Sequence, residues 1–122
     1  MAFTPIENTE FAVNRQRDGS SLRLQMMGNA DLRAKQAVDE LLVAVDQEAT
    51  TGSIQEVVVD LRELLFMNSS CLKALVTWLS SVQARPTPQQ YRIRFLREPS
   101  AHWQVRSLGA LAAFAPGIVQ VE

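Results

Sequence analysis

Three small polar side chains, Asn68, Ser69 and Ser70, stand where an apolar strand pattern passes into a helix pattern. They lie within the stretch VVVDLRELLFMNSSCLKALVTWL, residues 57–79. Side-chain oxygens at a helix start accept hydrogen bonds from the unpaired first-turn amides and contribute about 1 kcal/mol. Such a cap needs only one of the three residues. A helix N-terminus also attracts anions, so a hydroxyl there is well placed to carry a phosphate.

Cys71 and His102 are the only cysteine and the only histidine of the chain. A single cysteine excludes an internal disulfide, and one residue of each kind is too few for a Cys/His metal site. A thiol at a helix start has a lowered pKa, but Cys71 is predicted to be a small buried or half-buried hydrophobe, because the sequence places no base beside it. No carboxylate pair, glycine-rich phosphate loop or triad spacing occurs, so we predict neither an enzyme nor a cofactor.

The N-terminal half is predicted to contain a hairpin, a helix and a central strand. Residues 11–26 form the hairpin, because Asp18-Gly19 suits a tight reversal between two apolar runs. A break that begins at Gly28 precedes an amphipathic helix over 34–48. Residues 54–61 include three consecutive valines, a pattern typical of a strand buried on both faces in the centre of a sheet.

The helix that carries the polar site is predicted over 70–83, because its apolar residues form one broad stripe. Residues 61–67 are predicted to form the connector before it, and Asp60 to fix that connector by accepting backbone hydrogen bonds. An alternative for Asp60 is a ligand site at the carboxyl end of the strand. One edge of the stripe is predicted either to pack in the core or to face a partner. The residues of this edge are Cys71, Ala74 and Trp78.

The C-terminal third completes the predicted fold. Alternation indicates a strand over 91–96, followed by a helix over 101–108 that Gly109 ends and by an edge strand over 118–121. We expect one α/β domain spanning residues 1–122, in which a mixed four- to five-stranded sheet carries helices mainly on one face.

The overall composition excludes several classes of partner. A net charge of -1 and a pI near 5.8 provide no basic field for nucleic acid. The start MAFTPIENTEF lacks the basic and apolar regions of a signal peptide, and the longest mostly apolar stretch, 108–121, is short and broken by Pro116. We therefore expect no membrane insertion, and the single cysteine fits a reducing cytoplasm.

The stretch 57–79 resembles the signature of STAS domains, the fold of bacterial anti-sigma-factor antagonists. That signature is an apolar strand ending in Asp, a short connector, and Phe-Met-Asp-Ser-Ser/Thr-Gly-Leu opening a helix. The upstream stretch LRLQMMGNADLRAKQAVDELLVAV resembles the family's strand, glycine turn and first long helix, so the resemblance covers the chain from Phe11 onward. Two positions depart from the pattern. Asn68 stands where the family has aspartate, and Cys71 where it has glycine.

The resemblance implies partner switching. In such a cycle the unmodified domain binds a regulatory serine kinase or anti-sigma factor, and phosphorylation of one serine ends binding until a serine phosphatase removes the phosphate. Ser69 occupies the position of that serine, and Ser70 is the second choice. The implied partner-binding residues are Asn68, Ser69, Ser70, Cys71, Ala74 and Trp78.

A second family role remains open. STAS-like domains also act as small subunits of membrane lipid-transport ATPase complexes, where the domain binds its partner constitutively and without phosphorylation. The departures at Asn68 and Cys71 suit a permanent partner, which does not require a charge switch. The sequence does not predict an oligomeric state.

Overall fold

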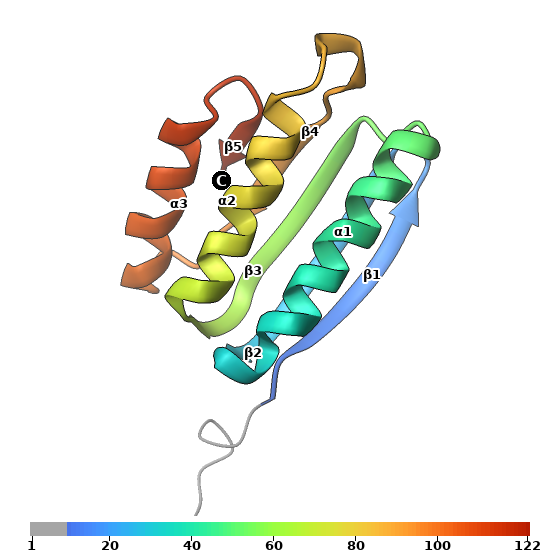
Figure 1. The fold of residues 1–122 in the computed structure, drawn as a ribbon. Coiled ribbons are helices and arrows are strands. Elements are labelled where there is room, and N and C mark those ends of the chain that lie inside the picture. Colours follow the sequence, from blue (N-terminus) through green and yellow to red (C-terminus); the bar gives the residue numbers. More distant parts are fainter. Residues whose placement is uncertain (1–9) are drawn as a thin grey trace, which may run out of the picture.

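The computed structural model describes residues 10–122 as one five-stranded sheet with helices on one face, shown in Figure 1. The strands lie in sequence order across the sheet; β1 is antiparallel to β2, and the remaining neighbours are parallel. The predicted fold class, a mixed sheet with helices mainly on one face, is confirmed. The strands are β1 (Ala12–Asp18), β2 (Ser21–Ala30), β3 (Glu56–Met67), β4 (Arg92–Leu96) and β5 (Val119–Val121), and the α-helices are α1 (Lys35–Thr51), α2 (Ser69–Gln83) and α3 (His102–Phe114).

The predicted hairpin forms, but β2 does not break at Gly28. Gly19 adopts φ 61° in the turn between β1 and β2, a conformation that glycine accepts at little cost. Gly28 also has a positive φ, 84°, yet it stays within β2, and the pairing with β3 shifts register just after it. The predicted break is therefore wrong, because Gly28 lies next to a register shift in the pairing of β2 with β3 and the strand continues to Ala30.

Strand β3 is central, as predicted, but it is longer than the apolar run. Residues 61–67, predicted as a connector, continue the strand because they remain paired with the end of β2. The pairing of β3 with β4 stops at Asp60. The end of β3 therefore extends beyond β4 and leads into α2.

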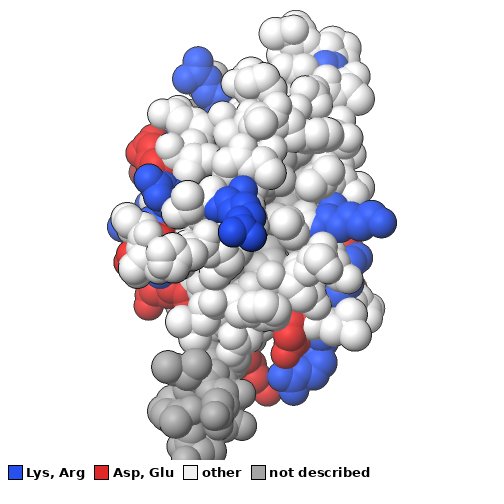
Figure 2. Space-filling view, turned by 90° about the vertical axis from the view of Figure 1, so that its left-hand side faces the viewer, with Lys and Arg blue, Asp and Glu red and all other residues white. Residues whose placement is uncertain are grey.

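Helix α3 passes through Gly109 and ends at Phe114, so the predicted end of this helix is wrong. Glycine costs about 1 kcal/mol relative to alanine inside a helix. The burial of Leu108 and Leu111 on one face offsets this cost and continues the helix past the glycine. Arg106 is the only lysine, arginine, aspartate or glutamate in α3, and the side of the molecule that α3 forms shows few charged side chains (Figure 2).

The core lies between the three helices and one face of the sheet, and it joins buried residues of α1, α2, α3 and strands β2 to β5 into one cluster. The other face of the sheet has no helices over it in Figure 1. Val58 and Asp60 point to that side and are nevertheless buried. Arginine side chains of neighbouring strands pair with carboxylates there, as in the contacts of Arg23 with Asp60 and of Arg94 with Glu56. The central strand is thus buried on both faces, but by helices on only one of them.

Candidate protein-binding site at the start of helix α2

Asn68 is the residue that caps helix α2. Its backbone is extended, with φ -77° and ψ 168°, and its side-chain Oδ1 accepts a hydrogen bond from the backbone N–H of Cys71 at 2.9 Å. The backbone N–H of Asn68 donates to the carbonyl of Ala30 at 2.9 Å, which fixes the helix start against the end of β2. The helix therefore begins at Ser69, one residue earlier than predicted.

This cap uses neither of the two serine hydroxyls. Ser69 is exposed and Ser70 is half-buried. Neither hydroxyl makes a hydrogen bond with another residue in the range 10–122. Their backbone N–H groups belong to the first turn of the helix, where no intrahelical acceptor is present. Two uncommitted hydroxyls thus stand at a helix start that favours negative charge.

Cys71 is fully buried, which corrects its predicted place among the partner-binding residues. Its side chain points into the core, and its S–H donates toward the carbonyl oxygen of Asp31 at 3.6 Å. Burial raises the pKa of the Cys71 thiol. The alternative prediction, a small buried hydrophobe, is confirmed.

Ala74 and Trp78 are also buried, on the side of α2 that faces α1. The Trp78 indole Nε1 donates a hydrogen bond to the Tyr91 hydroxyl at 2.7 Å. Core packing therefore accounts for both residues at the edge of the α2 stripe. The predicted site residues with free surface at the helix start are Asn68, Ser69 and Ser70.

Gln104 of α3 holds the end of β3 in place. It is fully buried, and its Nε2 donates to the carbonyl oxygens of Leu61 and Leu64 at 2.7 and 3.2 Å. Its Oε1 accepts a hydrogen bond from the backbone N–H of Glu98 at 2.7 Å. These carbonyls lie beyond Asp60, where β3 no longer pairs with β4. Gln104 therefore supplies the hydrogen bonds that a neighbouring strand would otherwise donate. The sequence carried no signal for this role, since Gln104 lies 43 residues from Leu61.

Three exposed apolar side chains lie in the chain segments next to the helix start. Leu32 is 71% exposed in the short 3-10 helix Leu32–Ala34 that follows β2. Leu65 and Phe66, each 47% exposed, lie near the end of β3, three and two residues before Asn68. The sequence pattern did not indicate the exposure of Leu65 and Phe66, because residues 61–67 have the pattern of a connector. The pairing shift next to Phe66 turns it away from the core.

Asp60 lies on the helix-free face and does not belong to this site. Its carboxylate accepts hydrogen bonds from the Arg62 side chain at 2.8 and 2.9 Å, from the Arg62 backbone N–H at 3.1 Å, and from Arg23 at 2.8 Å. The hydrogen bonds from Arg62, opposed by burial and reinforced by Arg23, lower the pKa of Asp60 to about 2. The predicted role, acceptance of a backbone hydrogen bond, is confirmed, although the segment that it fixes is a strand.

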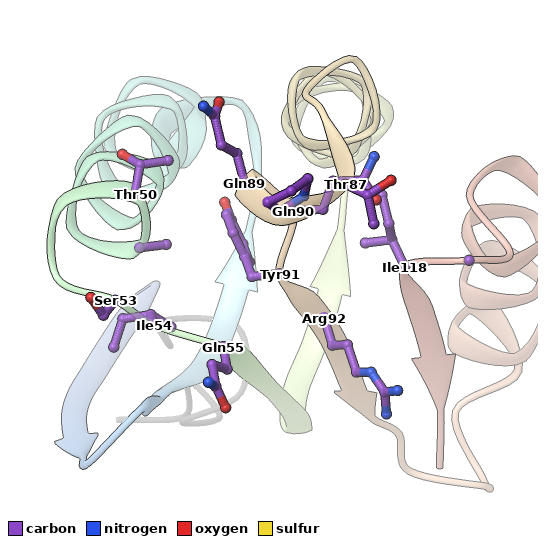
Figure 3. A pocket seen from close by; sticks show the side chains of 13 residues that line it. Thr50, Ser53, Ile54, Gln55, Thr87, Gln89, Gln90, Tyr91, Arg92 and Ile118 are labelled. Carbon is purple, nitrogen blue, oxygen red and sulfur yellow. The ribbon is translucent and has the colours of Figure 1, made fainter.

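A further hollow lies at the opposite end of the sheet, where β3 and β4 begin. Its volume is about 760 Å³, and Figure 3 shows Gln55, Gln89 and Arg92 among the side chains around it. It contains none of the predicted site residues. Among residues 10–122 no group of three or more histidine, cysteine, aspartate or glutamate residues could hold a metal ion. No helix described is both long enough and apolar enough to span a bilayer.

Solved structures with this arrangement of elements include anti-sigma factor antagonists. One from Mycobacterium paratuberculosis matches with a TM-score of 0.66 over 88% of this chain and 84% of its own, at 17% sequence identity. SpoIIAA in its unphosphorylated form matches with a TM-score of 0.58 over 91% and 87%, at 15% identity. The chain has the STAS fold.

The phosphorylated form of SpoIIAA, a cell fate determinant of Bacillus, matches this STAS fold with a TM-score of 0.58 over 93% and 91% of the two chains, at 13% identity. No family model and no curated protein sequence matches the chain. At identities this low the comparisons establish the shared fold and not a shared activity. The resemblance seen in residues 57–79 is thus confirmed as a STAS fold of the SpoIIAA type.

Proposed function

We propose that this protein is a non-catalytic, protein-binding regulatory module of the anti-sigma-factor antagonist type, switched by phosphorylation of Ser69. One observation carries the proposal: Asn68 caps α2, and the Ser69 hydroxyl is left exposed and without a hydrogen bond to any described residue. A hydroxyl that served only to start the helix would be occupied. Ser70, half-buried beside it, is the second candidate.

A phosphate on Ser69 changes the surface without unfolding the domain. It adds about -1.5 to -2 charges at pH 7 next to free first-turn N–H groups and the positive end of the helix dipole. The cap persists, because Asn68 supplies it with an amide oxygen that phosphorylation does not touch. The modified protein therefore keeps its fold and presents a strongly negative group where a partner docks.

The docking surface that we propose combines Ser69 with Leu32, Leu65 and Phe66. Exposed apolar side chains of this size are typical anchors of protein interfaces. A partner that covers them excludes water from the Ser69 hydroxyl, so a charge placed there costs binding energy. The partners of this cycle are a regulatory serine kinase or anti-sigma factor and a serine phosphatase, which restores binding.

The test is the intact mass of the protein isolated from its native cells and after incubation with each serine kinase that co-purifies with it, in the presence of ATP. We expect a single phosphate increment that Ser69→Ala removes and that Ser70→Ala retains. Retention of the phosphate increment in Ser69→Ala would show that another residue is phosphorylated. A mass unchanged with every co-purifying kinase contradicts phosphorylation.

A second function, a constitutively bound subunit of a membrane lipid-transport ATPase complex, is favoured by a separate observation. Asn68 offers no carboxylate for a kinase to recognise, while the exposed apolar residues suit permanent contact. In this case the protein co-purifies with an ATPase in the presence of ATP, and its mass shows no phosphate. Release of the partner on phosphorylation contradicts this second function.

A further inference from the structure

Helices α1 and α2 lie side by side over the sheet (Figure 1). A groove of about 570 Å³ lies between them. This volume is within the usual range of small-molecule sites. The groove follows α2 from Ser70 to Ser81, a length of roughly 16 Å at 1.5 Å per helical residue. An exposed residue of α1, Val43, borders it.

The floor of the groove is apolar. Leu42 of α1 and Ala74 and Trp78 of α2 line it, and each is buried beneath the surrounding surface. Val43, 59% exposed, adds an apolar rim. A ligand lying along this floor would bury apolar surface over most of its length.

The polar groups along the middle of the groove are already satisfied. The Thr77 hydroxyl donates to the Lys73 carbonyl at 3.1 Å, and the Ser81 hydroxyl donates to the Thr77 carbonyl at 3.2 Å. At the far end the Asp46 carboxylate accepts hydrogen bonds from Arg85 and, at 2.6 Å, from the Tyr91 hydroxyl. None of these groups requires a ligand.

The end near Ser70 differs. Lys35 and Asp39 neutralise each other there as an ion pair. The ammonium group of Lys73 forms no ion pair with any of residues 10–122, and the Ser70 hydroxyl makes no hydrogen bond within that range. Both residues line the groove beside the first turn of α2, which favours negative charge. One end of the groove therefore offers a cation and a hydroxyl, and the rest offers apolar surface.

We propose that this groove binds a single-chain fatty carboxylate, with the carboxylate at Lys73 and Ser70 and the alkyl chain over Leu42, Ala74 and Trp78. Charge complementarity selects the head group, because Lys73 is the unpaired charge that lines the groove in the part of the chain that the structure describes. The length of the floor selects a chain of medium length. This inference does not depend on the proposed function.

The test uses octanoate, decanoate and dodecanoate, each below its micellar concentration, with the full chain carrying Trp103→Phe. Trp78 is then the only tryptophan, so its fluorescence reports on the groove. We expect saturable binding at one site by calorimetry, with affinity rising by up to about tenfold for every two methylenes added. Dodecyltrimethylammonium, with the same chain and the opposite charge, should not bind at this site.

Two variants distinguish dodecanoate binding in the groove from nonspecific binding. Lys73→Gln should weaken dodecanoate binding by about threefold to tenfold, and the matched control Arg106→Gln, which neutralises an exposed cation on α3, should leave it unchanged. Thr77→Phe places a ring over the floor from an exposed position and should abolish binding while circular dichroism and the melting temperature stay unchanged. Equal binding of the cationic amphiphile, or undiminished dodecanoate binding in folded Thr77→Phe, overturns the proposal. If Thr77→Phe fails to fold, full affinity in Lys73→Gln overturns it.

Discussion

The indole Nε1 of Trp78 donates a hydrogen bond to the hydroxyl of Tyr91 at 2.7 Å, and the two rings lie 6.4 Å apart at 41°. The Tyr91 hydroxyl in turn donates to the Asp46 carboxylate, which also pairs with both amino groups of the Arg85 guanidinium. Burial and the Asp46 contact raise the pKa of Tyr91 far above its ordinary value. This chain of contacts joins α1, α2 and the residue before β4, and two of its members, Asp46 and Trp78, line the groove between the two helices.

Tyr91→Phe should destabilise the protein by about 1–3 kcal/mol, because the buried Trp78 indole loses its acceptor and Asp46 keeps only Arg85. Urea unfolding at neutral pH measures the loss. The matched control is the same substitution in a Trp78→Phe background, where no indole is left unpaired. A cost that is equal in both backgrounds would show that the Trp78 hydrogen bond contributes nothing.

Asn68→Ala should cost about 1 kcal/mol of stability, because the N–H of Cys71 loses its acceptor. Asn68→Asp should keep the cap and add a favourable charge at the positive end of α2, so its stability should equal or slightly exceed that of the natural protein. Thermal unfolding of the two variants side by side checks the assignment. Ser69→Ala is the control. A larger loss of stability in Ser69→Ala than in Asn68→Ala would contradict Asn68 as the cap.

Asp60 should make stability depend on acid pH. Its pKa falls from an ordinary value of 3.8 to about 2 in the folded protein. The unfolded chain thus binds the proton more readily, and stability from this group is present above about pH 4 and lost as pH falls toward 2. Because Arg23 and Arg62 are partly exposed, we expect about 1–2 kcal/mol.

Asp60→Asn tests this linkage by urea unfolding between about pH 2 and pH 7. The variant should be less stable than the natural protein at neutral pH, and the gap should close at the acid end. Asp39→Asn serves as the comparison, since Asp39 is also paired with a cation but has a half-exposed side chain. A gap for Asp60→Asn that stays constant with pH would rule out an ionic origin.

Phe66→Ser should weaken binding of the physiological partner by tenfold or more while changing stability little, because the side chain is 47% exposed. Leu32→Ser should act in the same direction. Pull-down of the partner with the natural protein and each variant measures the effect. Val105→Ser on α3 is the matched control, since its side chain is 48% exposed on another element. Equal losses in all three variants would contradict a docking surface at Leu32 and Phe66.

Gly109→Ala should stabilise the protein by about 0.5–1 kcal/mol, because alanine favours the helix and loses less backbone entropy on folding. Gly109 is exposed in the middle of α3, and a Cβ built there meets no atom within 4 Å. Thermal unfolding measures the gain. Gly19→Ala provides the contrast: its φ of 61° makes a side chain costly, so that variant should lose stability. An unchanged melting temperature for Gly109→Ala would contradict the account of α3.

Local patterns in the sequence determined the elements and their order. The Asp18-Gly19 turn, the valine run of β3 and the apolar stripe of α2 each depend on neighbours in the chain, so spacing alone indicates them. The same holds for the junction at Asn68, Ser69 and Ser70, where composition indicated a helix start and a STAS-like motif.

The tertiary structure decided what each side chain at that junction does. The placement of the helix start against β2 and the exposure of Phe66 both depend on elements distant in the chain. Residues 61–67 have the pattern of a connector, because a register shift against β2 breaks the strand alternation there. Gln104 of α3 donates hydrogen bonds to the carbonyl oxygens in this segment that have no partner in β4. Such contacts join residues about 40 positions apart. Burial and hydrogen bonding at the site are therefore set by nonlocal packing, which no local periodicity encodes.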